Sequence, residues 1–443
     1  MNRSSATEGR RAASEILAAV RRGRRLDRAF ADIEFLDQRD RKRCRRLVFG
    51  IERLRGRLDH LLDRKVRKGL VSLDVQVRDV LRIGVYEILY MDGVPEYAVV
   101  SQAVELARSL AGPGVGGLVN AVLRAIAKEG GGEEYFPDPT ADPAGYLSTW
   151  GSHPRWLVER WLARWPFVDV RNLIEGNNRI PPIHLRCLWD TPEHARDALA
   201  TRGIEAKIVG FGTGCVVLQE DTSLVESLDI VPSIVQDPAA ALVVQYCNPA
   251  PDALVADLCA APGGKAIALG ARGNMVLAAD ASLRRLRLVQ ENVRRAQQMA
   301  GEGRHLRVYT AQADARSPVM SKMDMLLLDV PCTGTGTLRR SPDVRWKITP
   351  DRLAALTALQ ERILHVCADA VPKGGTLVYS TCSLEPEENE DQIDAFLHKR
   401  SDFRVEPGSG VDECYLDGLG QLYVLPQSFG FDGTFAARLR RSH

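Results

Sequence analysis

Several features that would assign this chain of 443 residues to a specialised class are missing from it. It has no apolar run of roughly 18 residues or more, which argues against a membrane-spanning helix. Its nine cysteines are odd in number and include no Cys-x-x-Cys pair, which argues against a disulfide framework and against a zinc site. With 45% hydrophobic and 26% charged residues, the composition is that of a globular protein. We therefore expect a cytoplasmic protein with reduced thiols, no metal centre and no membrane association.

Positive charge is concentrated near the N-terminus, although the net charge of the whole chain is only +2. Arginine and lysine outnumber acidic residues by more than two to one between residues 1 and 57, with dense runs at 21–25 and 39–46. Because the planar guanidinium group can donate two parallel hydrogen bonds to a phosphate, an arginine-rich face suits nucleic acid. A solvated helix face is the alternative. The excess has one sign and lies at one end of the chain, which favours RNA binding.

The sequence pattern divides the chain into several parts. Apolar residues recur at helical spacing over residues 1–130, with a glycine-rich break at 112–117, and this predicts an all-α domain. Residues 131–150 are rich in glycine, proline and acids and are expected to form an exposed linker. Short apolar stretches alternate with helix candidates over residues 151–245, which indicates a small α+β subdomain. The chain is therefore expected to be multidomain.

Residues 246–443 show a different rhythm, in which strand, turn and helix repeat. The candidate strands are Leu254–Leu258, Met275–Ala279, Leu306–Thr310, Met325–Asp329 and Thr376–Ser380. Apolar strands that alternate with helices predict a Rossmann-like α/β domain, whose mostly parallel sheet has helices on both faces. Because such sheets bind ligands at the carboxyl ends of their strands, the residues at those ends are the candidates for function.

The first three strand ends carry residues that suit a nucleoside cofactor. A glycine-rich turn follows the first strand and consists of Cys259, Ala260, Ala261, Pro262, Gly263, Gly264 and Lys265. It lets a backbone approach a ligand closely, but it matches neither a phosphate-binding P-loop nor a Gly-x-Gly-x-x-Gly motif. Asp280 ends the second strand, where a carboxylate can accept hydrogen bonds from ribose hydroxyls. Asp314 follows the third strand, where an acid could bond the amino group of adenine.

The next two strand ends each carry a cysteine in a polar turn. Cys332 follows Asp329, and Cys382 follows the strand that begins at Thr376. Both thiols are expected at the cofactor edge of the sheet, on neighbouring strands, so both are candidates for chemistry. A cysteine elsewhere is usually a small buried apolar residue, and that is the interpretation for Cys44, Cys187, Cys215, Cys247, Cys367 and Cys414.

These motifs resemble those of the RNA 5-methylcytosine methyltransferases, and within them the bacterial 16S ribosomal RNA methyltransferase B type. The resemblance rests on the turn and acids named above together with three longer runs: 329–336, 339–346 and 379–390. Arg39–Arg41 and Asn120–Arg124 resemble the NusB-like RNA-binding domain that this subfamily carries at its N-terminus, and 152–158 and 235–238 also fit. The matches extend over nearly the whole chain. Departures are small: Cys187 and Ala239–Ala241 stand where polar residues are common.

The resemblance implies a cofactor, a substrate and a set of roles. S-adenosylmethionine would be held by the turn 259–265 together with Asp280, Asp314 and Asp329. Cys382 would add as a thiolate to C6 of cytosine, which makes C5 nucleophilic. Asp329 would bind the base at N3 and the amino group, and Cys332 would assist product release. The expected partner is RNA, in particular 16S ribosomal RNA with the target base out of its stack, and the expected state is a monomer.

Two classes of alternative remain open at this point. One is methylation of another target, such as tRNA, uracil, DNA cytosine or a protein amine. In DNA cytosine enzymes the nucleophile is the cysteine of the Pro-Cys pair, which here is Cys332. The other is an RNA-binding assembly factor that kept an inactive methyltransferase fold. The intact cysteine and cofactor motifs argue against the second alternative.

Overall fold

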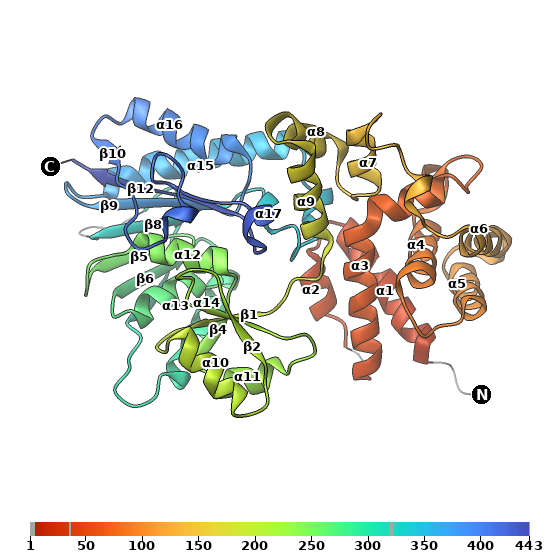
Figure 1. The fold of residues 1–443 in the computed structure, drawn as a ribbon, viewed down its shortest axis with the longest axis horizontal. Coiled ribbons are helices and arrows are strands. Elements are labelled where there is room, and N and C mark those ends of the chain that lie inside the picture. The colour runs from red at the N-terminus through yellow and green to blue at the C-terminus, as the bar shows by residue number, and fades with distance from the viewer. Residues whose placement is uncertain (1–4, 35–36, 319–322, 443) are drawn as a thin grey trace. The chain divides into compact units, whose positions relative to one another are not determined.

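The computed structural model describes residues 5–34, 37–318 and 323–442. The chain divides into two compact units, one made of Met1–Ile180 and Leu338–Lys347 and the other of Pro181–Thr337 and Ile348–His443. Figure 1 labels the elements of both. Within the described ranges, no helix is both long and apolar enough to cross a membrane.

The described part of the first unit is helical, as the apolar spacing predicts (Figure 1). Its longer helices are α1 (Ser5–Arg21), α2 (Leu26–Ala31), α3 (Gln38–Asp63), α4 (Val75–Tyr90), α5 (Glu96–Ala111), α6 (Gly116–Glu129), α7 (Pro143–Thr149), α8 (Arg155–Arg164) and α9 (Phe167–Asn178). Short 3₁₀ turns lie at Leu70–Ser72, Pro113–Val115 and Glu133–Tyr135.

Local residues define where these helices begin and end. The Asp74 side chain caps α4 by accepting from the backbone N–H of Gln76 at 2.7 Å. Helix α5 ends at Gly112, whose φ of 89° is in the left-handed region that glycine tolerates. Helices α1 and α3–α6 then share one apolar core, in which Ile51 and Leu123 are fully buried.

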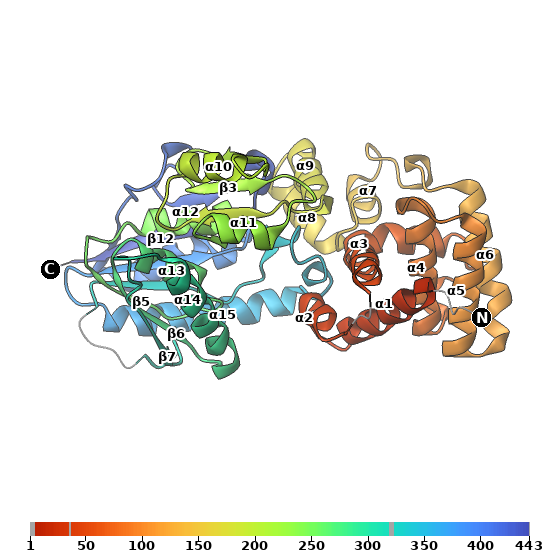
Figure 2. The same ribbon diagram turned by 90° about the horizontal axis from the view of Figure 1, so that it is seen from below.

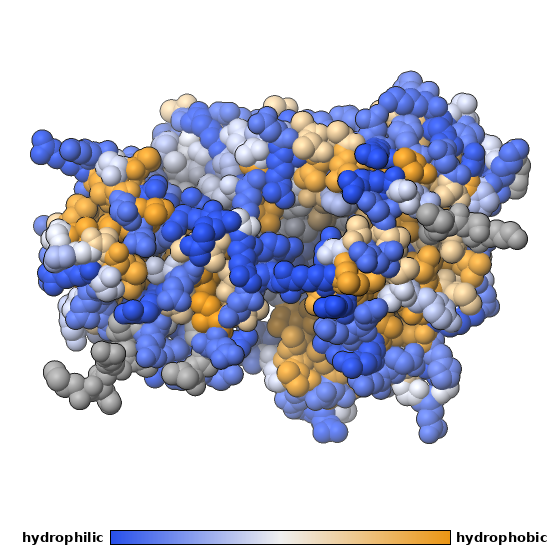
Figure 3. All heavy atoms as spheres, turned by 180° about the vertical axis from the view of Figure 1, so that it is seen from behind, coloured by the Kyte–Doolittle hydropathy of each residue, from blue (hydrophilic) through white to orange (hydrophobic). Residues whose placement is uncertain are grey.

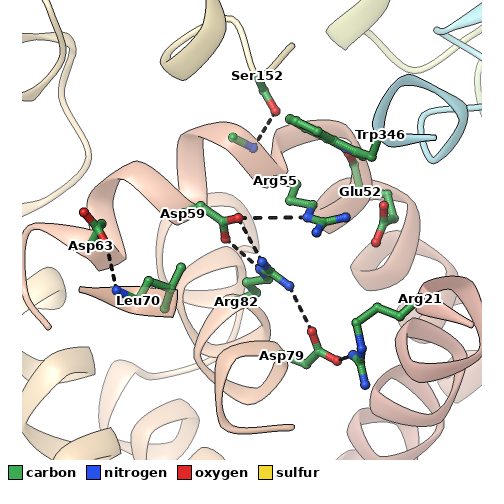
Figure 4. A network of polar contacts seen from close by, with 11 residues as sticks. Arg21, Glu52, Arg55, Asp59, Asp63, Leu70, Asp79, Arg82, Ser152 and Trp346 are labelled. Atoms are coloured by element: carbon green, nitrogen blue, oxygen red, sulfur yellow. Dashed lines mark hydrogen bonds and ion pairs between the residues drawn. The ribbon is translucent and has the colours of Figure 1, made fainter. Parts of the chain in front are cut away.

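Ion pairs inside this helical unit use part of the N-terminal arginine excess. Figure 4 shows Arg82 donating to both carboxylate oxygens of Asp59, at 2.6 and 2.8 Å, and to Asp79, which also pairs with Arg21. Arg10 forms a buried pair with Glu87, which Arg43 also contacts. These arginines are engaged by carboxylates within the fold, so only the rest of the basic run is open to a nucleic acid.

The stretch expected to be a linker, residues 131–150, is folded. It contains the turn at Glu133–Tyr135 and helix α7, in which Tyr146 and Leu147 are 1% exposed. The hydroxyl group of Tyr146 donates to Glu133 at 2.5 Å. Aromatic side chains among the glycines and prolines supply the apolar area that holds this stretch in place.

The run 339–346, one of the motifs named above, packs within the helical unit even though segments of the second unit lie on both sides of it in the chain. Arg345 is fully buried and donates to the carbonyl groups of Arg53 and Ser152 at 3.1 and 3.0 Å and to Asn178 Oδ1 at 2.8 Å. Trp346 donates its indole N–H to the carbonyl of Glu52 at 2.8 Å; Figure 4 shows the Trp346 side chain near Glu52 of α3. Burial lowers the pKa of Arg345 to about 9. The segment just before this run contains Pro331 and Cys332 and is named the Pro-Cys loop. The run therefore anchors the end of that loop in the helical unit.

The second unit begins with a small antiparallel sheet, as expected for an α+β subdomain. Its strands β1 (His184–Cys187), β2 (Ala206–Val209), β3 (Cys215–Leu218) and β4 (Ser233–Val235) stand in the order β2-β3-β1-β4. Helices α10 (Pro192–Ala200) and α11 (Leu224–Ile230) accompany it. Strands β1 and β3 match the short apolar stretches of the sequence at 184–188 and 215–218, and α10 matches the helix candidate at 192–201, while β2 and β4 were not predicted.

The larger sheet of the second unit has the order β10-β12-β9-β8-β5-β6-β7, with β11 paired to β12. Its parallel strands are β5 (Leu254–Asp257), β6 (Met275–Asp280), β7 (Val308–Gln312), β8 (Met325–Asp329) and β9 (Thr376–Thr381). The prediction is confirmed for these five, with β7 beginning two residues late. Strands β10 (Phe403–Val405), β11 (Leu422–Val424) and β12 (Thr434–Arg441) form an antiparallel edge that was not predicted.

Helices cover both faces of this sheet, as predicted, and Figures 1 and 2 show the layers. One face carries α12 (Pro238–Cys247), α13 (Gly264–Ala271) and α14 (Leu283–Met299), and the other carries α15 (Pro350–Ala370) and α16 (Glu390–Lys399). Alternate residues of a strand enter different cores: Leu327 of β8 packs in the first, and its neighbours Leu326 and Leu328 pack in the second. The short helix α17 (Pro426–Phe429) precedes β12.

The surface mixes polar and apolar residues. On the face drawn in Figure 3, hydrophobic residues are interspersed with hydrophilic ones. Large apolar side chains that are exposed, such as Val71, Tyr97 and Phe211, come from separate elements. Isolated apolar residues of this kind are common on globular proteins and do not by themselves indicate an interface.

Candidate active site

The two candidate cysteines lie together at the ends of β8 and β9. These strands are parallel neighbours, with Asp329 opposite Ser380, so the turns that follow them meet at one edge of the sheet. The sulfur atoms of Cys332 and Cys382 are 3.3 Å apart and both side chains are partly buried. The contact with Cys382, together with burial, raises the pKa of the Cys332 thiol well above its ordinary value. Cys332 is therefore held as a neutral thiol beside Cys382.

A buried carboxylate fixes the Pro-Cys loop. Glu388 is fully buried and accepts from the backbone N–H of Thr333 at 2.9 Å, from the Thr333 hydroxyl group, and from the Gln360 amide at 2.8 Å. Its own carbonyl oxygen accepts from Tyr379 at 2.7 Å. A carboxylate with several donors at short range positions the loop backbone closely.

The neighbouring residue Asn389 fixes the Thr-Cys loop, which is the turn at the end of β9 that contains Thr381 and Cys382. Its Oδ1 accepts from the Thr381 hydroxyl group at 2.5 Å, and its Nδ2 donates to the carbonyl of Ser383 at 2.9 Å. The two loops are also joined directly, because Gly336 donates its N–H to the carbonyl of Cys382 at 2.9 Å. A Cβ at Gly336 would lie 2.8 Å from that oxygen, so a side chain here would separate the loops.

Asp329 and Lys265 form an ion pair beside the thiols. Lys265 Nζ lies 2.6 Å from Asp329 Oδ2, and the hydroxyl group of Ser380 donates to Oδ1 at 2.9 Å. Burial alone would lower the pKa of Lys265, but the Asp329 carboxylate beside it raises that pKa above its ordinary value. The Lys265 ammonium also interacts electrostatically with Cys382.

The glycine-rich turn leads from β5 into the first turn of α13. Gly263 has a φ of 104°, which allows the sharp reversal, and no side chain caps α13. The first backbone N–H groups of such a helix have no intrahelical partner, so they face outward as donors. The turn itself is packed closely, because a Cβ at Gly264 would lie 2.8 Å from Gln236 Nε2.

Asp257, the last residue of β5, is a site residue that the sequence argument did not select. It is 1% exposed, and apart from a weak contact with the backbone N–H of Cys259 its carboxylate oxygens have no hydrogen-bond partner among the described residues. Burial, reinforced by the charge of Asp329, raises its pKa to about 7. A buried carboxylate without partners suits a ligand that brings a donor or a positive charge.

The remaining acids differ from each other in their surroundings. Asp280 ends β6, is 4% exposed, accepts from the backbone N–H of Ser282 at 2.9 Å and lies 3.4 Å from Arg285. Asp314 is held by Arg316 through hydrogen bonds of 2.6 to 3.0 Å, and these lower its pKa. The structure thus pairs Cys332 with Cys382 and Lys265 with Asp329, whereas the carboxylate of Asp314 is directed to an arginine of its own turn.

Five of the six cysteines expected to be packing residues are buried, but Cys414 is exposed, so the prediction is wrong for this residue. It lies in a short 3₁₀ turn at Glu413–Tyr415, where only the Tyr415 ring points into the core. The roles of Glu388 and Asn389 were also missed. The sequence signal for these two residues was the acidic run 386–390, which closely follows the turn that contains Cys382. Polarity alone would place that run on the solvent-exposed surface.

The Rossmann-like sheet carries two thiols, an ion pair and a glycine-rich turn at one edge. Three family models match the chain and identify its family. They are the NusB family over residues 7–128, the ferredoxin-like domain of the RsmF/B-type methyltransferases over 153–224, and the 16S rRNA methyltransferase RsmB/F family over 244–440.

Individual proteins agree with this assignment over most of the chain. The probable ribosomal RNA small subunit methyltransferase B of Synechocystis sp. is 32% identical over 91% of this chain and 92% of its own length. The ribosomal RNA small subunit methyltransferase B of Pseudomonas putida is 33% identical, over 97% and 98%. The crystal structure of PH0851 covers 98% of this chain and 99% of its own, with a TM-score of 0.77 and 25% identity. The chain belongs to the RsmB/F methyltransferase family and carries that family's NusB-like N-terminal domain.

Proposed function

We propose that the chain transfers a methyl group from S-adenosylmethionine to C5 of a cytosine in RNA, specifically in 16S ribosomal RNA, through a covalent bond between Cys382 and C6. The observation that carries this proposal is the contact of two thiols, 3.3 Å apart, beside the Asp329–Lys265 pair. One sulfur atom can then attack the base while the other stays neutral. Family membership supports ribosomal RNA as the substrate.

The residues around the glycine turn fit the cofactor. The cofactor would supply a methyl group activated by a sulfonium, and it also carries an amino group and a ribose. The open N–H groups at α13 and the turn 259–265 would approach the methionine part of the cofactor, and Asp280 would accept from the ribose hydroxyl groups. Asp257, buried without strong partners, fits a cationic group. Asp314 would have to leave Arg316 to contact adenine.

The chemical steps follow from the arrangement of the side chains. Cytosine C5 is a weak nucleophile, so the Cys382 thiolate first adds to C6, and C5 gains electron density. Asp329 would hold N3 and the amino group of the base, and the adjacent Lys265 ammonium would offset the negative charge that develops on the ring. C5 would then take the methyl group, with the sulfonium leaving as a neutral thioether, and would hold both the methyl group and the original hydrogen.

In the last step the C5 proton would pass to water and the bond between C6 and sulfur would break, so that Cys382 leaves as a thiolate. Cys332, whose raised pKa keeps it protonated, lies 3.3 Å from the Cys382 sulfur and would assist this release by donating a hydrogen bond to the departing thiolate. The target base would reach both thiols by leaving its stack. The same proposal includes RNA binding by the NusB-like domain, a monomeric state and a cytoplasmic location. It also includes domain boundaries near residues 130, 150 and 245.

The test is methyl transfer from labelled S-adenosylmethionine to unmodified 16S RNA, with product nucleosides separated and with Cys382→Ala in parallel. Label in 5-methylcytosine with the wild type alone is the expected result. Label in 5-methyluridine or in protein would overturn the cytosine assignment. Transfer to tRNA but not to 16S RNA would overturn the ribosomal substrate and leave the chemistry standing.

A further inference from the structure

A cavity of about 230 Å³ lies in the helical unit, outside the candidate active site. It is formed by α3, α7, the turn that follows α7, and α9, which are neighbours in Figure 1. Its polar and aromatic lining consists of Arg57, Tyr146, Trp150, Arg171, Glu175, Asn178 and Arg179. Pockets for drug-sized ligands measure about 300–1,000 Å³, so this one suits a smaller group such as a single base with its phosphate.

One wall of the cavity is a preformed flat platform. The guanidinium carbon of Arg57 lies 3.7 Å above the ring centroid of Trp150, and Arg57 Nε donates to the Trp150 carbonyl at 2.8 Å. Phe136 packs edge-on against the same indole ring at 5.1 Å. Unpaired bases stack on aromatic rings and on guanidinium planes, and a platform that is already ordered loses little entropy on binding.

The charge at the rim is positive. Arg171 pairs with Glu175 at 2.8 Å, and Glu175 is the one acidic residue in the lining. Neither Arg57 nor Arg179 has a carboxylate partner among the described residues, and the Arg179 side chain is exposed. Three guanidinium groups against one carboxylate favour a phosphate.

The opposite wall is held rigidly. Asn178 donates to the carbonyl of Gly151 at 2.7 Å and accepts from the buried Arg345 at 2.8 Å. Arg345 belongs to the run 339–346, which follows the Pro-Cys loop directly in the chain. The cavity therefore keeps its shape without a ligand.

We propose that this cavity binds one unpaired nucleotide of the RNA substrate, with its base against Arg57 and Trp150 and its phosphate at Arg171 and Arg179. The inference rests on the RNA substrate proposed above and adds a second point of recognition, separate from the base that is methylated. Contact at a second nucleotide positions the RNA without taking part in the chemistry.

The test compares the double variant Arg171→Ala/Arg179→Ala with Arg155→Ala. Arg155 is the control, because it pairs with Glu159 on α8 at 2.8 Å, as Arg171 pairs with Glu175, and also with Asp142 at 3.2 Å, but it does not line the cavity. Binding of unmodified single-stranded 16S RNA is measured by fluorescence anisotropy, and methyl transfer by initial rates. The double variant should bind about tenfold more weakly, with KM for RNA raised far more than kcat is lowered, and Arg155→Ala should match the wild type.

A cross-link settles the location. RNA containing 4-thiouridine should link to the peptides of Trp150 or Tyr146 in the wild type and much less in the double variant. Equal RNA affinity of the double variant and the control would overturn the inference, as would a loss seen only with ribosomal particles and not with naked RNA, which indicates a protein partner. Since binding is read without catalysis, failure of methyl transfer alone would count against the proposed function and not against this site.

Discussion

Two sites achieve their geometry by different means: the thiol site, which holds Cys332 and Cys382, and the pocket, which is the cavity lined by Arg57 and Trp150. At the thiol site, buried side chains hold backbone loops: Glu388 and Asn389 fix the two cysteine turns through hydrogen bonds that water does not reach. In the pocket, a stacked arginine and an indole provide a flat surface at the edge of solvent. The first arrangement suits chemistry that needs atoms within a fraction of an ångström, and the second suits recognition of a flexible strand.

The comparison predicts the largest effect for a chemical link between the two thiols. Diamide should oxidise Cys332 and Cys382 to a disulfide, with two hydrogen atoms passing to the reagent, because the sulfur atoms are already 3.3 Å apart. Methyl transfer should be abolished, the intact mass should fall by two hydrogen atoms, and dithiothreitol should restore both. RNA binding through the pocket should persist.

Cys414→Ser is the control for that oxidation, since Cys414 is exposed. The variant should be inactivated as fast as the wild type. Peptide mapping that joins any other pair of cysteines in the inactive protein would contradict the geometry of the site.

A smaller but still large effect is expected from Glu388→Ala. The substitution leaves the N–H and hydroxyl groups of Thr333 and the amide of Gln360 without their acceptor. We expect about 2–4 kcal/mol less stability and roughly a hundredfold lower kcat, because the Pro-Cys loop shifts relative to Cys382. Urea unfolding and initial rates measure the two effects.

Glu361→Ala is the matched control on α15, where the carboxylate is half exposed and pairs with Lys399 at 2.6 Å. Its stability should change by less than about 1 kcal/mol. If Glu388→Ala behaved in the same way, the buried carboxylate would not be what fixes the loop.

A third effect concerns Asp257 and pH. Burial raises its pKa to about 7, so between about pH 4 and pH 7 the folded chain keeps a proton that the unfolded chain has lost. Stability therefore falls as the pH rises through this window, by no more than about 4 kcal/mol, and stays lower above it. Asp257→Asn should remove this part of the pH dependence. Parallel stability profiles of variant and wild type, from urea unfolding at several pH values, would refute it.

Sequence reasoning succeeded where one local rule decides the structure. Alternating apolar strands and helices predicted β5 to β9, and the residues at their carboxyl ends meet as the parallel topology requires. The antiparallel strands β10 to β12 were not predicted, because β10 and β11 are only three residues long and β12 carries several arginines. For such strands, pairing with a neighbour and not the local pattern determines the structure: β12 pairs with β9, and β10 and β11 pair with β12.

Contacts between distant segments were beyond the sequence. Nothing in the composition of 339–346 shows that Arg345 is buried among carbonyl groups of the helical unit, 192 or more residues away for three of its partners. The ion pair of Asp314 with Arg316 is local, yet sequence alone cannot choose between it and a ligand. Arg57, Trp150 and Arg179 likewise form a pocket only through tertiary packing.

The measurement that tests the central claim most directly is covalent trapping. Cys332→Ala, Cys382→Ala and the double variant are each incubated with 16S RNA and S-adenosylmethionine and separated on a denaturing gel. The account predicts a protein–RNA band with Cys332→Ala, where release is impaired, and no band with either protein that lacks Cys382. A band that persists in Cys382→Ala and disappears in Cys332→Ala would make Cys332 the nucleophile and contradict the account.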